Sequence, residues 1–143
     1  MSLKPQKKSD VDKVWAQKRY EREVKIYPEY HLIISEGTKT EPNYFNEIKT
    51  IINQKYRGRI QLEVYGSGDN TTFLFERARS FVKNSPNTFK HVWIVYDIDD
   101  FPKDKINEVP NLCEQENRTS ECCYHAIWSN QCIELWYLLH FSF

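Results

Sequence analysis

The sequence lacks the features of membrane-bound and secreted proteins. No apolar run reaches the roughly 18 residues that would span a bilayer, and no apolar segment follows the basic N-terminus as it does in a signal peptide. The four cysteines lack the paired C-x-x-C spacing of a structural zinc site, so we interpret them as free, buried thiols. Together these absences predict a cytoplasmic protein with no membrane partner and with reduced cysteines.

Apolar residues are scarce, and neither sign of charge is in excess. Apolar residues make up 40% of the 143, even with tyrosine counted, against roughly 45–50% in typical soluble domains. The 20 basic and 20 acidic side chains give zero net charge, which removes the simplest argument for nucleic-acid binding. The charges are nevertheless separated, because residues 1–25 are mainly basic and residues 97–121 mainly acidic. We expect a basic arm over residues 1–28 and one domain over residues 29–143.

Four short segments have the pattern of β-strands. Residues 31–34 and 92–96 are continuous apolar runs, which is typical of central strands buried on both faces of a parallel sheet. Residues 60–65 alternate apolar and polar side chains, as at a half-exposed edge, and residues 124–128 are expected at the opposite edge. Helical segments separate these strands. The sequence therefore predicts an α/β fold, a Rossmann-like three-layer sandwich with a mainly parallel four-stranded sheet in the order 2-1-3-4.

Three helices are expected between the strands. Pro42 suits the first turn of one helix, and Asn70 suits the N-cap of the next. A third helix is expected within residues 104–117, where Pro110 lies in the first turn or breaks the helix. The core-facing side chains are expected to be Tyr44, Ile48, Ile51 and Ile52 in the first helix and Leu74, Ala78, Phe81 and Val82 in the second.

A fourth, apolar helix is expected to start near Ser129 or Asn130 and to run through residues 133–139. Its large side chains have the spacing of core packing, which we favour over a platform for stacking bases. The chain stops directly after this helix without a capping signal, so we expect the domain to be C-terminally incomplete. The aromatic residues assigned to the core here are Trp128, Trp136, Tyr137 and Phe141.

Carboxylates follow both predicted central strands. Glu36 comes directly after the first, and the third ends in Asp97, Asp99 and Asp100. Strand order reverses between these two strands, which is where open α/β sheets bind ligands. Asp97 and Asp99 lie on the same side of the strand because side chains alternate along it. Oxygen ligands without an accompanying histidine or cysteine favour Mg²⁺ or Mn²⁺.

Other polar residues have weaker signals. Glu41 and Glu134 are expected at the same edge of the sheet, where either completes a second cation site. Acidic residues are also common after strands merely as helix caps or solvent-facing groups, so both interpretations stay open. Residues 66–69 are interpreted as a turn rather than a phosphate-binding loop. His125 and His140 are interpreted as hydrogen-bonded structural histidines.

Three blocks of sequence resemble the RloB-like family of prokaryotic defence-associated proteins. They are residues 33–45 (IISEGTKTEPNYF), residues 96–100 (YDIDD) and residues 129–141 (SNQCIELWYLLHF). That family is similar to Toprim domains, the catalytic core of type IA and type II topoisomerases, bacterial primases and related nucleases. The resemblance implies a Toprim-like catalytic domain in which Glu36, Asp97 and Asp99 bind Mg²⁺ for phosphoryl chemistry on nucleic acid. It also implies an ATPase partner protein.

The resemblance leaves three functions open. A metal-dependent nuclease is the leading expectation, with Glu36, Asp97 and Asp99 as catalytic ligands and Asp100, Glu41 and Glu134 as further metal ligands. Nucleotidyl transfer of the primase kind would use the same cations. A non-catalytic subunit that binds nucleic acid through its basic arm, beside the ATPase, is the third. The sequence does not distinguish DNA from RNA as substrate, or a monomer from a homodimer.

Overall fold

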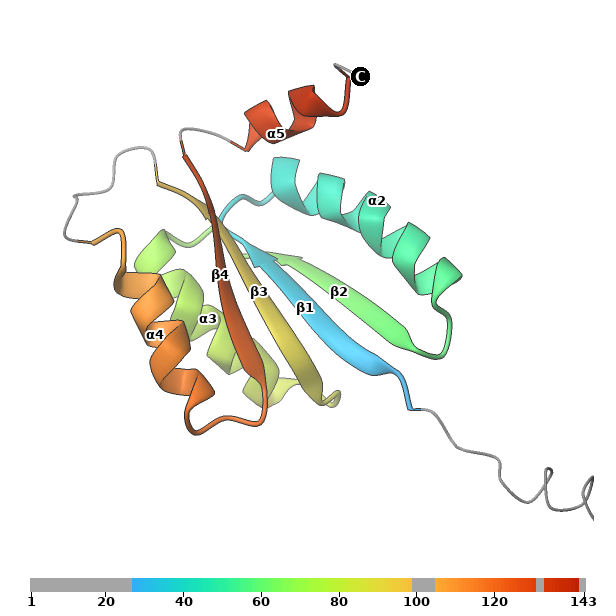
Figure 1. The fold of residues 1–143 in the computed structure, drawn as a ribbon, viewed down its shortest axis with the longest axis horizontal. Helices are drawn as coiled ribbons and strands as arrows, with labels where there is room; N and C mark the ends of the chain where they lie inside the picture. Colours follow the sequence, from blue (N-terminus) through green and yellow to red (C-terminus); the bar gives the residue numbers. More distant parts are fainter. Residues whose placement is uncertain (1–26, 99–104, 131–132, 142–143) are drawn as a thin grey trace, which may run out of the picture.

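Four parallel strands form one sheet in the order β2-β1-β3-β4, as the sequence predicts (Figure 1). The computed structural model describes residues 27–98, 105–130 and 133–141. The two continuous apolar runs form the central strands, and the two other segments form the edges. The strands are β1 (Glu29–Ser35), β2 (Ile60–Gly66), β3 (Phe89–Asp97) and β4 (Cys123–Ser129).

Helices cover both faces of the sheet and give a three-layer sandwich. In Figure 1, α2 lies on one face and α3 and α4 lie on the other, while α5 lies beside the start of α2, beyond the carboxyl ends of the strands. Asn70 caps α3 as predicted, because its side chain accepts a hydrogen bond from the Phe73 N–H at 3.3 Å. Pro110 lies in the first turn of α4, where a missing N–H leaves no helical hydrogen bond unmade. The helices are α2 (Thr40–Lys55), α3 (Thr71–Asn84), α4 (Glu108–Asn117) and α5 (Glu134–Leu139).

The closest packing lies between the sheet and the α3/α4 layer. Leu32 and Ile34 of β1 and Val92 and Ile94 of β3 are fully buried there, and each such side chain contributes roughly 1.5–3 kcal/mol of apolar burial. Phe75 of α3 was not predicted in this core, yet it is buried beside the predicted residues of its helix. The core contributions of the helices come from Leu74, Phe75, Ala78, Val109 and Cys113, with Phe81 and Val82 half-buried.

The last helix differs from its prediction. Strand β4 continues through Ser129, because that residue still pairs with Asp97 of β3. The helix therefore begins at Glu134, not near Ser129 or Asn130, and Glu134 is its first residue. No helix in the described part of the chain is both long and apolar enough to cross a membrane. The helix is only six residues long, and most of its apolar side chains are exposed, namely Leu135, Trp136, Leu138 and Leu139.

Several other residues expected in the interior are also exposed. Trp128 on the edge strand is 48% exposed and Phe141 is 87% exposed, so the prediction that both belong to the core is wrong. Ile51 lies on the solvent side of α2 and is 62% exposed. Cys123 is exposed although Cys113 and Cys122 are buried, because neighbouring residues of a strand face opposite sides. Cys132 lies outside the described residues.

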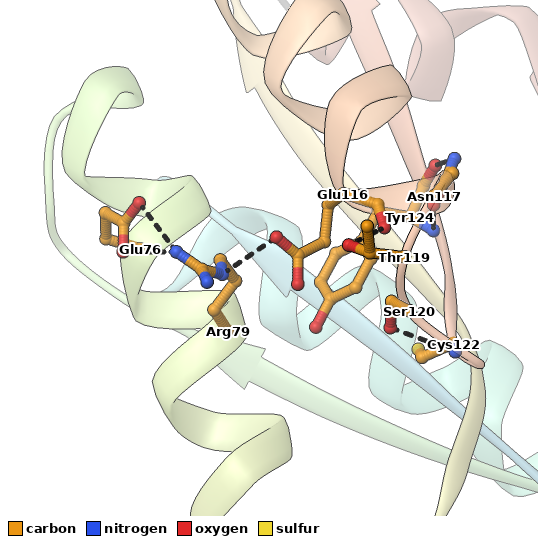
Figure 2. A network of polar contacts seen from close by, with 8 residues as sticks. All are labelled: Glu76, Arg79, Glu116, Asn117, Thr119, Ser120, Cys122 and Tyr124. Carbon is orange, nitrogen blue, oxygen red and sulfur yellow. Dashed lines mark hydrogen bonds and ion pairs between the residues drawn. The ribbon is translucent and has the colours of Figure 1, made fainter.

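Each edge strand is fastened by an asparagine from the helix that precedes it. Asn53 of α2 donates to the Leu62 carbonyl at 3.1 Å and accepts from the Leu62 N–H at 2.7 Å. Asn117 of α4 makes the same pair with Tyr124 of β4, at 2.9 Å and 2.7 Å (Figure 2). These backbone groups point away from the sheet, so each asparagine amide makes the hydrogen bonds that a further strand would otherwise make at that edge.

Arg79 joins α3 to the end of α4. Its guanidinium lies 3.2 Å from the Glu116 carboxylate of α4 and 3.3 Å from that of Glu76 on its own helix (Figure 2). The same guanidinium lies above the Phe75 ring, 5.9 Å from its centre. Because the charged groups are partly exposed, the ion pair contributes no more than about 1 kcal/mol. Arg79 thus connects α3 to the end of α4 and contributes little to the free energy of unfolding.

We predict that N53A and N117A each lower the free energy of unfolding by about 1–3 kcal/mol, because each leaves two edge-strand backbone groups unpaired. Urea denaturation measures the change. N111A is the matched control, since Asn111 is an exposed asparagine of α4 whose side chain makes no such contact. Its effect should stay within about 0.5 kcal/mol. Equal effects in all three variants would contradict the role of the paired amides.

Candidate active site

Glu36 and Asp97 meet where the strand order reverses. Ser35, the last residue of β1, pairs with Val95 of β3. The N–H of Glu36 then donates to the Val95 carbonyl at 3.1 Å, and Asp97 ends β3. The structure therefore brings these two predicted carboxylates to the carboxyl ends of neighbouring central strands. This is the position at which open α/β sheets bind ligands.

Glu36 is half-buried against the start of α3. The buried hydroxyl of Thr71 donates to Glu36 Oε2 at 3.3 Å. Burial raises the pKa of Glu36 above 4.5, and the negative charges of Asp97 and Glu41 raise it further. Hydrogen bonds from the Thr71 side chain and the Asp97 backbone oppose this increase but do not cancel it. Asp97 and Glu41 are therefore both near enough to repel the charge of Glu36.

Asp97 is held by the neighbouring edge strand. Ser129, the last residue of β4, pairs with Asp97 and donates a hydrogen bond from its hydroxyl to Asp97 Oδ1. The Ser129 carbonyl also accepts from the Ile98 N–H at 3.1 Å. The sequence did not single out Ser129 or Thr71. Their contacts connect residues 32 and 35 positions apart, the first through the register of β3 with β4 and the second through the position of α3 beside Glu36.

Two glycines allow the loop after β1 to pack closely. A Cβ on Gly37 would lie 1.9 Å from Glu41 Oε2, so the Glu41 carboxylate lies directly against this loop. A Cβ on Gly66 would lie 2.6 Å from the Gly37 carbonyl oxygen and 2.5 Å from Pro42 Cγ. Backbone and ring atoms have little freedom to move away. Gly66 thus permits the end of β2 to pack against the loop that follows Glu36.

The charges that act on Tyr137 indicate that Glu134 of α5 lies at the same edge of the sheet as Glu41 and Asp97. Burial, followed by the negative charges of Glu41 and Glu134, raises the pKa of Tyr137 to about 12. The charge of Asp97 acts on it in the same direction. The Tyr137 ring also lies 4.6 Å, centre to centre, from that of Tyr44 in α2. Four predicted ligands therefore gather at one edge, which we call the acidic rim: Glu36, Glu41, Asp97 and Glu134. Asp99 and Asp100 lie outside the described residues.

The acidic rim has no cation of its own among the described residues. Some other carboxylates of the chain are paired, as Asp69 is with Arg77 at 2.9 Å and Glu29 with Lys90 at 2.5 Å. Within the described ranges, no lysine or arginine pairs with a rim carboxylate. In the described ranges, no three oxygens from different rim carboxylates lie within 4.8 Å of one another. An all-oxygen set with uncompensated repulsion fits a hard cation such as Mg²⁺ or Mn²⁺.

An aromatic cluster beside the rim fastens α5 to α2. The Tyr44 hydroxyl lies 2.8 Å from His140 Nε2 and accepts a hydrogen bond from Trp136 Nε1 at 3.1 Å. The structural interpretation of His140 is therefore confirmed. That of His125 is confirmed as well, since its Nε2 lies 2.9 Å from His91 Nδ1. Trp136, which the sequence placed in the core, instead contacts α2 through its indole nitrogen.

Residues 66–69 end β2 and bend toward α3. The N–H groups of Ser67 and Gly68 donate to the carbonyls of Ser35 and Glu36 at 2.9 Å and 3.0 Å. Gly68 adopts a positive φ of 71°. These two amides therefore support the loop that follows β1 and are not free to bind a phosphate.

We predict that E36Q is more stable than the wild type at neutral pH. The folded protein binds the Glu36 proton more tightly than the unfolded chain does, so ionisation lowers stability as the pH rises through the folded-state pKa. Glutamine keeps the acceptor for Thr71 and never ionises. Thermal denaturation across the pH range should show the advantage of E36Q shrinking below pH 4.5.

E47Q is the matched control for this experiment, because Glu47 is an exposed glutamate of α2. A pH-dependent gain of equal size in E47Q would contradict the explanation, and so would an advantage of E36Q that does not change with pH.

Comparison with known proteins identifies a family for the chain. Neither curated proteins nor solved structures include a match to this sequence. A family model described as RloB-like protein matches residues 31–143, from within β1 to the last residue. The matched range contains β2, β3, β4 and all four rim carboxylates. The chain therefore belongs to the RloB-like protein family.

Proposed function

We propose that the chain is a Mg²⁺- or Mn²⁺-dependent nuclease of the Toprim type. The observation that carries this proposal is the meeting of Glu36 and Asp97 at the strand-order reversal, with no basic side chain of the described residues to neutralise them. Membership of the RloB-like family supports it. The proposed substrate is DNA or RNA, and the proposed setting is prokaryotic antiviral, restriction-linked defence in the cytoplasm.

In this proposal Glu36 and Asp97 hold the cation, with Asp99 and Asp100 following directly in the sequence. The bound cation would activate a water molecule and stabilise the departing oxygen of the phosphodiester. The hydroxyls of Thr71 and Ser129 orient the two carboxylates, as outer hydrogen-bond partners do in metal sites. Glu41 and Glu134 lie at the same edge and are proposed as ligands of a second cation.

Tyr137 favours hydrolysis by water over transfer to a tyrosine. Enzymes that form a covalent phosphotyrosine need a hydroxyl that gives up its proton. The pKa of Tyr137 is about 12, because the side chain is buried beside carboxylates, so this hydroxyl stays protonated at neutral pH. Tyr137 is therefore suited to donating a hydrogen bond at the rim and poorly suited to nucleophilic attack.

The basic arm and a partner protein complete the proposal. Residues 1–28 would hold the nucleic-acid backbone through phosphate contacts, which gives binding that weakens with salt and does not depend on sequence. An ATPase would act beside the chain, as proposed from the family resemblance. Nucleotidyl transfer and non-catalytic binding use the same surfaces, so the test must separate three outcomes.

We predict that the purified chain shortens labelled DNA or RNA when Mn²⁺ or Mg²⁺ is present and that EDTA stops the reaction. D97N and E36Q should each lower the rate by about 100-fold or more, equivalent to about 2.7 kcal/mol of transition-state stabilisation. E47Q, which removes an exposed carboxylate of α2, should leave the rate unchanged. Gel analysis of end-labelled and internally labelled strands measures both the rate and the product lengths.

The same assay distinguishes the alternatives. Strands that lengthen when labelled nucleotides are supplied would replace the nuclease with a nucleotidyl transferase. If D97N still supports nucleic-acid processing in the complete defence system with its ATPase, the catalytic role of the rim is wrong. Salt-sensitive binding without any change in strand length, in that complete system, would identify a binding subunit.

We further predict that Y137F keeps cleavage within about tenfold of the wild type, since a hydrogen-bond donor is lost but no nucleophile. No protein–nucleic acid adduct should accumulate with either form, as judged by denaturing gels of the labelled substrate. A loss in Y137F as large as that in D97N, together with a covalent adduct in the wild type, would assign the attack to Tyr137.

A further inference from the structure

A second cluster of ligand-type side chains lies at the opposite end of the central strands. Glu29, His31 and His91 each offer one ligand atom, and these atoms all lie within 4.8 Å of one another. His31 precedes Glu36 by five residues. At about 3.3 Å per residue, it lies about 16 Å from the acidic rim along β1. We call these three residues the histidine site. Its donor set differs from the rim, because two of its three ligands are imidazoles.

A bulge in β3 creates the histidine site. Tyr30 pairs with Phe89, but the next residue of β1, His31, pairs with His91, so Lys90 is the extra residue. A bulge of this kind re-aims the side chains around it. Here it sets the two imidazoles side by side, with ring centres 4.9 Å apart.

The nitrogen of His31 that faces this site is unused. His31 Nε2 is buried and has no hydrogen-bond partner within the described structure. It lies 3.8 Å from Glu29 Oε2, which is too long for a hydrogen bond. Lys90 Nζ contacts the other carboxylate oxygen, Oε1, at 2.5 Å. Glu29 therefore keeps Oε2 directed toward His31 while Lys90 holds its far side.

His91 is oriented by a third histidine. His91 Nδ1 lies 2.9 Å from His125 Nε2, and the His125 ring stacks on Trp93 with centres 4.1 Å apart. This contact leaves His91 Nε2 as the nitrogen available to a metal. Metal-binding histidines usually have their second nitrogen fixed in this way by a neighbouring group.

We propose that Glu29, His31 and His91 bind one Zn²⁺ or similar transition-metal ion, with water in the remaining position. Two imidazoles and one carboxylate form a set typical of zinc, whereas the all-oxygen rim suits Mg²⁺. Ligands at about 2.0–2.2 Å from one ion lie roughly 3.3–3.5 Å apart, so the site must contract by about 1 Å. The exposed side chain of Glu29 has the freedom to provide that movement. The ion would then tie the start of β1 to the bulge in β3.

The test is a titration of the full chain with Zn²⁺ and with Co²⁺ after treatment with a chelator. Calorimetry should give one equivalent of Zn²⁺, and the visible spectrum of Co²⁺ should indicate nitrogen and oxygen ligands. H31N and H91N should each weaken binding more than about tenfold. K90A should tighten it, because a competing positive charge is removed beside Glu29.

Three controls separate this site from other ligands of the chain. H140N removes a histidine at the far end of the sheet and should bind Zn²⁺ as the wild type does. D97N and E36Q should also leave Zn²⁺ affinity unchanged, so the histidine site is tested independently of the proposed nuclease activity. Circular dichroism shows whether each variant is folded. If the histidine variants unfold, E29Q, which changes an exposed side chain, tests the site in their place.

Two results would overturn the proposal. One is Zn²⁺ binding that H31N, H91N and E29Q all leave unchanged, or no binding at all by the folded chain. The other is a sulfur-to-cobalt charge-transfer band in the Co²⁺ spectrum, which would place the ion on cysteines instead.

Discussion

The parallel pairing of β1 with β3 is the constraint on which the rest of the molecule depends. Both strands contain a continuous apolar run and pair on both edges with other strands, so a slip of one residue would turn buried side chains such as Leu32 and Ile34 to the wrong face. The same register fixes Glu36 beside Asp97 at one end and His31 beside His91 at the other. One strand pair therefore builds both polar sites, and it separates oxygen ligands from imidazole ligands by the length of the strand.

The low apolar content is accommodated by unequal faces of the sheet. The α3/α4 face holds nearly all of the fully buried side chains. The opposite face carries imidazoles and Trp93, because α2 packs mainly on β2. Ile127, two residues after His125 on β4, lies on this face and is 45% exposed. A domain with 40% apolar residues thus concentrates its burial on one layer and leaves the other free for polar chemistry.

Sequence patterns predicted what local spacing determines. The strand order follows from two continuous apolar runs, and the α3 cap follows from Asn70. Glu36 and Asp97 could be paired because strand ends in a parallel sheet share an edge. The histidine site could not be predicted, since it depends on a bulge at Lys90 that the amino-acid sequence does not indicate. Thr71 and Ser129 escaped notice because their partners lie 35 and 32 residues away, and meet them only once α3 is packed beside β1 and β4 is paired with β3. The start of α5 was mistaken because Ser129 and Asn130 are typical N-cap residues, whereas the pairing of β4 with β3 extends through Ser129.

The way the chain neutralises its acids distinguishes the acidic rim from the rest of the surface. Some carboxylates have a basic partner, as Asp69 has Arg77, and the pKa of Asp69 is lowered accordingly. At the rim the partners are neutral hydroxyls, and the pKa of Glu36 is raised instead. Crowding such carboxylates at a strand-order reversal adds repulsion and gains no ion pair within the described residues. Such an arrangement is suited to a cation from solution that supplies the missing charge, which is the premise of the proposed metal site.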